Sequence, residues 1–209
     1  MSVSIILLAA GESTRMGSQK ALLPWAGSPT LLEYHLNEAQ PLRGVTEIIV
    51  VTGHDPAVIN QIVTRRGENL PHTTYHARAR VRTAHNPDYL TGKVSSIRAG
   101  LAALNRGTDT IMLLAVDQPR PAPILRTLIE RHTAGSSQIT VPIHNGRRGH
   151  PVIFNRALLP ELSAITEETQ GIRAVLAAHA GTTTEIEMGD DTVFLDLNSP
   201  ADVPTTTAL

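Results

Sequence analysis

The 209-residue chain contains no cysteine. This absence excludes disulfides, thiolate zinc sites, iron–sulfur clusters and a cysteine nucleophile, and it favours a cytoplasmic location. Aromatic residues are also scarce, with one Trp, three Tyr and two Phe. So few rings cannot form the stacking platforms that hold single-stranded nucleic acids.

The chain has no excess of charge of either sign, because 18 Lys and Arg stand against 19 Asp and Glu. A balanced charge offers no general attraction to a nucleic-acid polymer or to an anionic membrane. Long hydrophobic runs are missing too: the apolar run at Val3 to Ala10 is too short to cross a bilayer and follows no cation, unlike a secretory signal. We therefore expect neither kind of partner.

Short apolar runs alternate with amphipathic patterns along the first two thirds of the chain. The runs, rich in β-branched residues, predict strands buried on both faces at Val3–Ala9, Glu47–Thr52 and Thr110–Val116. Helical patterns follow them around residues 30–40, 55–63, 94–104 and 124–129. This alternation predicts an α/β fold of Rossmann-like type, with a mostly parallel central sheet and helices on both faces.

The last third has a weaker pattern. It predicts further strands at Gln138–Ile143, Pro151–Phe154, Thr184–Glu187 and Val193–Leu197, with an irregular loop from Asn145 to His150. We expect these strands to extend the same sheet in mixed directions. Since no linker or repeat divides the chain, we predict one domain over residues 1–209.

In open α/β sheets, ligands bind beyond the carboxyl ends of the parallel strands. The loop after the first predicted strand offers small residues from Ala9 to Gly11 and two cations, Arg15 and Lys20. Small residues let backbone N–H groups approach a phosphate, and cations neutralise it. The alternative is an ordinary surface loop with solvated cations.

Two further segments are candidates for ligand contacts at the carboxyl edge of the predicted sheet. Asp117 follows the strand Thr110–Val116, where a carboxylate beside a polyphosphate could hold Mg²⁺, or could merely cap the helix that begins near Pro121. The turn from Asn86 to Gly92 leads into a helix in which Ser95 or Ser96 could read a base edge or simply cap the helix.

These segments resemble the molybdenum cofactor nucleotidyltransferases. The family pattern Leu-Ala-Ala-Gly-x-Ser-x-Arg-Met-Gly-x-x-Lys-x-Leu-Leu-Pro is met at every fixed position from Leu8 to Pro24. Asn86-Pro87 with Gly92 and Ser96, Asp117-Gln118-Pro119, Gly149-His150-Pro151 and the segment 196–202 follow in the family's order. The resemblance thus extends over nearly the whole chain.

The resemblance implies a role for each matching position. Arg15, Lys20 and Asp117 would be catalytic, and Asp117 would bind Mg²⁺. Asn198 stands where cytidylyl members usually have an Asp close to the metal; its carbonyl oxygen can still serve as a ligand. From the residues themselves, His150 with Arg147 and Arg148 offers three potential cations to an anionic acceptor; the alternative is a connecting loop with solvated arginines. The nucleotide would contact Leu8, Ala9, Ala10, Gly11, Arg15, Lys20, Gly92 and Ser96.

The implied reaction is the transfer of a nucleoside monophosphate from an NTP to the phosphate of molybdopterin, with release of pyrophosphate. Ala9-Ala10-Gly11 favours CTP over GTP, since guanylyl members carry Ala-Gly-Gly there. A molybdoenzyme or its chaperone is the further partner that this reaction implies. Three alternatives remain: another phosphorylated acceptor, an NAD(P)H-dependent oxidoreductase of a heterocycle on the same fold, and a catalytically silent nucleotide-binding regulator.

Overall fold

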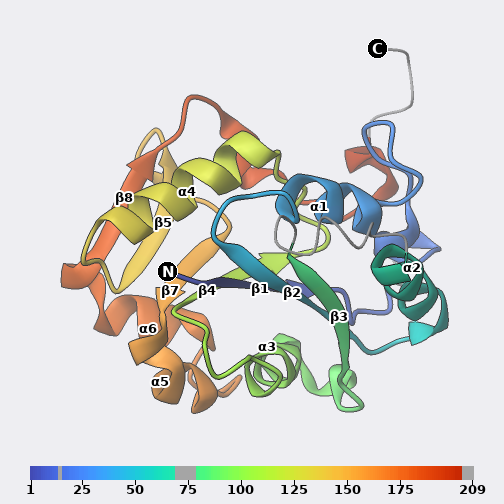
Figure 1. Ribbon diagram of the computed structural model, residues 1–209, viewed down its shortest axis with the longest axis horizontal. Helices are drawn as coiled ribbons and strands as arrows, with labels where there is room; N and C mark the ends of the chain where they lie inside the picture. The colour runs from blue at the N-terminus through green and yellow to red at the C-terminus, as the bar shows by residue number, and fades with distance from the viewer. Residues whose placement is uncertain (14–15, 69–78, 204–209) are drawn as a thin grey trace.

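The computed structural model describes residues 1–13, 16–68 and 79–203. One eight-stranded sheet forms its centre (Figure 1), with the order β3-β2-β1-β4-β7-β5-β6 and with β8 paired to β5. The strands are β1 (Val3–Leu8), β2 (Val45–Thr52), β3 (Arg80–His85), β4 (Thr110–Ala115), β5 (Ile139–His144), β6 (Arg147–Arg148), β7 (Val152–Asn155) and β8 (Thr183–Glu187).

Helices cover both faces of this sheet. They are α1 (Leu31–Ala39), α2 (Pro56–Glu68), α3 (Lys93–Ala102), α4 (Ala122–Ala134), α5 (Leu159–Ser163) and α6 (Ile172–Ala178). In Figure 1, α1 and α4 lie above the sheet, and α3, α5 and α6 lie below it. The apolar side chains divide accordingly into two buried clusters, one packed by α1, α2 and α4 and the other by α3, α5 and α6. The predicted fold class is confirmed.

Strand direction explains where the chemistry can gather. β1 pairs in parallel with β2 and β4, and β2 pairs in parallel with β3. β7 runs antiparallel to β4, with Leu113 opposite Val152. The start of β7 therefore lies at the edge where β1 and β4 end, and residue 150 comes to the same edge as residues 9 and 117.

The prediction of a strand at Val193–Leu197 is wrong. Residues Asp191–Phe194 form a 3-10 turn, begun by the Asp190 carboxylate accepting from the Thr192 N–H at 2.9 Å. Val193 and Leu197 are fully buried, as apolar strand residues would be. The carbonyl of Val193, however, accepts from the Arg120 side chain and the backbone N–H of His150, so it is not available to a strand neighbour.

The predicted irregular loop from Asn145 to His150 is partly regular. Asn145 and Gly146 both have positive φ angles, of 50° and 74°, as a tight hairpin turn requires. The turn brings Arg147 and Arg148 back against β5 as the short strand β6.

Candidate active site

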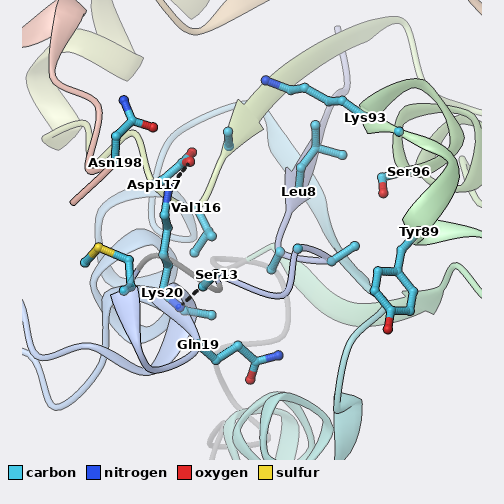
Figure 2. A pocket seen from close by; sticks show the side chains of 17 residues that line it. Leu8, Ser13, Gln19, Lys20, Tyr89, Lys93, Ser96, Val116, Asp117 and Asn198 are labelled. Carbon is cyan, nitrogen blue, oxygen red and sulfur yellow. Dashed lines mark hydrogen bonds and ion pairs between the residues drawn. The ribbon is translucent and has the colours of Figure 1, made fainter. Parts of the chain in front are cut away.

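A cleft of about 370 Å³ opens at the carboxyl edge of β1 and β4 (Figure 2). The loop after β1 forms one wall and the beginning of α3 forms the other. Its lining includes every described residue that we predicted for the nucleotide and the metal: Leu8, Ala9, Ala10, Gly11, Lys20, Gly92, Ser96, Asp117 and Asn198. Arg15 lies outside the described residues.

Backbone hydrogen bonds hold the small-residue loop at the end of β1. The Ala9 N–H donates to the Val51 carbonyl at 2.9 Å, and the His54 N–H donates to the Ala10 carbonyl at 3.0 Å. A methyl group added to Gly11 would meet no atom of the residues that the structure describes within 4 Å. The loop thus presents its backbone to open space, as a phosphate-binding loop must.

Lys20 and Asp117 meet at one end of the cleft (Figure 2). The Lys20 ammonium lies 2.8 Å from the Asp117 carboxylate, and the two side chains are 14% and 27% exposed. The Lys20 backbone N–H donates to the Ser13 hydroxyl at 3.0 Å, and the Leu197 N–H donates to the Asp117 carbonyl at 2.9 Å. These bonds hold the backbone of each partner in the ion pair, although Lys20 and Asp117 are 97 positions apart in the sequence.

Asp117 does not cap α4. That helix begins after Pro121 without a side-chain cap, and the first free N–H, of Ala122, donates to the Glu38 carboxylate. Glu38 comes from α1, on a different part of the chain. The alternative of a purely structural role for Asp117 as a helix cap is therefore ruled out.

The donors in the cleft suit Mg²⁺ only in combination with a substrate. No cluster of three or more His, Asp or Glu side chains that could hold a metal occurs among the described residues. Asp117 and Asn198 both line the cleft, one with a carboxylate and one with an amide oxygen. Mg²⁺ is commonly held by one or two protein oxygens together with phosphates and water, so these two side chains fit such an ion.

The other end of the cleft is formed by the turn before α3. Gly92 precedes this helix with a φ angle of 126°, and a Cβ there would clash with the Glu167 side chain. Ser96 does not cap α3, nor does Ser95: their hydroxyls accept from the Asn86 amide at 3.0 and 2.9 Å. The Glu167 carboxylate caps the helix instead, accepting from the backbone N–H of Val94, the second residue of α3, at 2.8 Å.

A second cavity, of about 650 Å³, adjoins the cleft on the side of β5 and β7. His150 lines it, together with residues of α3, α6 and the segment between α5 and α6. This is where we expect an acceptor, since the cavity lies beside the nucleotide cleft at the same edge of the sheet.

Of the three side chains predicted to face the acceptor, His150 and Arg148 line the second cavity, and Arg147 is not among the residues that line it. Burial, reinforced by the charges of Lys93 and Arg120, lowers the pKa of His150 to about 4, so its ring is neutral at pH 7. Arg147 lies over the Phe194 ring, 4.5 Å from its centre, and Arg148 pairs with Glu185 at 2.7 Å. The sequence could not reveal these contacts because the partners are 37 or more positions away.

Arg120 is a site residue that the sequence analysis missed. It is completely buried, and its guanidinium donates to the carbonyls of Pro119, His150, Val193 and Leu195 at 2.8 to 2.9 Å. Burial lowers its pKa to about 10, which leaves it charged at neutral pH. One side chain thereby joins the segment of Asp117, the start of β7 and the segment that leads to Asn198.

Lys93 and Tyr89 also line the cleft and were not predicted. Tyr89 packs on the end of β2: a Cβ at Gly53 would lie 2.6 Å from the Tyr89 Cβ. Lys93 could have been found, because it lies three residues before Ser96 and so shares its helix face.

The chain is similar to known proteins over most of its length. Residues 5–183 match the model of the MobA-like NTP transferase domain. The chain is 29% identical to the molybdenum cofactor cytidylyltransferase of Escherichia coli over 202 residues, which cover 96% of this chain and 93% of that protein. It is 30% identical over 208 residues to the molybdenum cofactor guanylyltransferase of Vibrio atlanticus, with the same two coverages.

Two further matches are an oxidoreductase and a solved structure that contains a metal. The nicotine blue oxidoreductase of Paenarthrobacter nicotinovorans is 29% identical over 205 residues, covering 94% of this chain and 92% of that protein. A Mycobacterium tuberculosis protein solved as a complex with manganese superposes with a TM-score of 0.66 at 25% identity, covering 97% of this chain and 96% of its own. In the described part of our chain, no helix is long and apolar enough to cross a membrane.

Proposed function

Because this chain belongs to the family of MobA-like NTP transferase domains, we propose that it transfers CMP from CTP to the phosphate of molybdopterin and releases pyrophosphate. The observation that carries the proposal is the pairing of Lys20 with Asp117 at 2.8 Å in a cleft beside the open Gly11 loop. Such a site offers a cation, a metal-binding carboxylate and free backbone to a triphosphate, and it needs no protein nucleophile.

In this proposal the triphosphate lies along the loop after β1. Lys20 leaves Asp117 for the β- and γ-phosphates and stabilises the charge that gathers on the departing pyrophosphate. Arg15 joins it, as the family pattern implies. Asp117 and Asn198 would hold Mg²⁺, which would neutralise phosphate charge when it is bound.

The base then lies at the other end of the cleft, towards Tyr89, Gly92 and Ser96. Ala10 lines the cleft, and in this proposal its methyl group narrows the space for the base relative to a glycine. Steric exclusion of this size is worth about 1 to 3 kcal/mol against the larger purine. Support for CTP also comes from the cytidylyltransferase among the relatives, although the guanylyltransferase is as similar.

The acceptor occupies the second cavity. Its phosphate oxygen attacks the α-phosphorus in line and forms a P–O bond. The bond from that phosphorus to the oxygen bridging the β-phosphate breaks, and its electron pair leaves with pyrophosphate. His150 stays neutral and can donate or accept a single hydrogen bond at the acceptor, because burial holds its pKa near 4.

A second candidate is favoured by one relative, the nicotine blue oxidoreductase. On this alternative the cleft takes a nicotinamide dinucleotide and the second cavity takes a heterocycle. The two functions predict different products, since transfer releases pyrophosphate and hydride transfer consumes NAD(P)H.

The Asp117→Asn variant tests the proposed function. It keeps the size of the side chain and removes one anionic ligand, so we expect turnover with CTP, Mg²⁺ and molybdopterin to fall by about 100-fold or more. Glu130→Gln on the outer face of α4 is the matched control and should leave turnover unchanged. Full activity of Asp117→Asn would refute the role of this carboxylate.

The base preference is tested in one vessel with CTP and GTP at equal concentration. We expect CMP to be incorporated in excess, and we expect Ala10→Gly to relax this preference. Equal incorporation by the unaltered protein would contradict the assignment to CTP and leave only nucleotidyl transfer.

A further inference from the structure

The cleft and the second cavity meet at one residue, Lys93. Lys93 is the first residue of α3, and among the described residues it alone lines both cavities. A small pocket of about 20 Å³ that lies between them is also lined by Lys93 and by His150. Figure 2 shows the Lys93 side chain reaching from α3 across the cleft, above Leu8.

Lys93 is exposed, and in the described ranges of the chain its ammonium has no ion pair. Two cations near it are paired, Lys20 with Asp117 and Arg148 with Glu185. Arg173 lines the second cavity but not the cleft. The charge of Lys93 also acts on His150: after burial, it is the second largest cause that lowers the pKa of the His150 ring. Lys93 is thus the cation that faces both binding spaces.

The backbone N–H groups at the start of α3 cannot replace Lys93 as the positive partner of an anion between the two cavities. The N–H of Val94, next to Lys93, donates to the Glu167 carboxylate at 2.8 Å. An anion of the protein itself therefore already occupies the end of the helix. A phosphate at the junction of the two cavities must find its positive partner in a side chain.

We propose that Lys93 is a catalytic residue whose ammonium bridges the acceptor phosphate and the α-phosphate of the nucleotide. This inference rests on the proposed function. Two anionic phosphates must approach within about 3.5 Å for the attack, and their repulsion is strong when water is excluded. A cation between them offsets this repulsion and stabilises the charge on the α-phosphoryl oxygens. The reaction transfers no proton to or from Lys93, and no bond to Lys93 forms or breaks.

The proposal is tested with Lys93→Met, which keeps the length of the side chain and removes its charge. Arg98→Met, on the same helix and exposed, is the matched control. We expect kcat with CTP, Mg²⁺ and molybdopterin to fall by about 100-fold in Lys93→Met. Lys93→Arg should recover most of it, and Arg98→Met should retain it. CTP affinity in calorimetry should change by less than about threefold, because Lys20 holds the β- and γ-phosphates.

A second measurement does not require turnover. Titration with inorganic phosphate, followed by the NMR signals of the His150 ring, should give an affinity at least tenfold weaker in Lys93→Met than in the unaltered protein. Equal phosphate affinity, or a kcat within threefold of the unaltered protein, overturns the role of Lys93. If the unaltered protein releases no pyrophosphate yet loses phosphate binding on removal of Lys93, the proposed function fails and the phosphate site remains.

Discussion

Replacing Arg120 with Met should destabilise the protein more than any substitution on its surface. The guanidinium is inaccessible to solvent and serves four carbonyl groups. Methionine fills a similar length but donates no hydrogen bond. The bonds of Arg120 to Pro119 and Val193 are fully buried. The Pro119 carbonyl then loses this donor, and the Val193 carbonyl keeps only the N–H of His150.

The size of the effect follows from these bonds. A buried carbonyl left without a partner costs about 1 to 3 kcal/mol, and bonds to a charged donor lie at the upper end. The bonds to His150 and Leu195 are only partly buried, so water can replace some of them. Burying a charged guanidinium costs free energy, and because methionine avoids this cost, part of the loss from the broken hydrogen bonds is offset. We therefore expect the free energy of unfolding to fall by about 3 to 5 kcal/mol.

Urea unfolding monitored by circular dichroism measures this change. Arg98→Met, exposed on α3, serves as the control and should stay within about 0.5 kcal/mol. A loss of less than 1 kcal/mol for Arg120→Met would refute the account, because it would mean that the four carbonyls find equal partners without the guanidinium.

Three other predictions concern single properties of the site and the core. Lys20→Ala should weaken CTP binding by at least about tenfold in calorimetry while leaving the urea midpoint unchanged; equal affinity would contradict its role. Burial lowers the pKa of His35 and of His132 from 6.5 to about 4. As the pH falls below 6.5, these histidines bind protons in the unfolded chain before they do so in the folded protein. The free energy of unfolding is therefore highest above pH 6.5 and falls towards pH 4, and at pH 5 the loss is about 2 kcal/mol per histidine. Equal urea midpoints at pH 7 and pH 5 would show that these rings are not buried neutral. Finally, Glu47→Gln should lower stability by about 2 to 4 kcal/mol in the same urea assay, since the buried carboxylate accepts from Ser4 at 2.7 Å and from Arg82 at 3.1 Å; a change below 0.5 kcal/mol would contradict this.

The sequence predicted those features that depend on local pattern. The apolar runs beginning at Val3 and Thr110 became β1 and β4, because buried parallel strands need continuous apolar residues on both faces. Their ends placed Ala9 to Gly11 beside Asp117, since parallel strands bring their carboxyl ends to one edge. The cleft was therefore predictable from strand order and motif position together.

Features that depend on distant partners could not be predicted. Val193 to Leu197 has the pattern of a strand, yet Arg120 binds the carbonyls of this segment from 73 and 75 positions away. The cations expected at the acceptor were assigned from proximity in sequence. In the fold, Arg148 pairs with Glu185 while it lines the second cavity, and α3 supplies a further cation there, Lys93. No periodicity in the chain encodes such pairings.

The most direct test of the account is the reaction itself. The purified protein is incubated with CTP, Mg²⁺ and molybdopterin, and both pyrophosphate and the nucleotide attached to the acceptor are quantified. The account predicts one pyrophosphate for each CMP transferred, with loss of both products when molybdopterin is omitted. Absence of pyrophosphate with each of the four NTPs, under conditions in which the protein is folded, would contradict it.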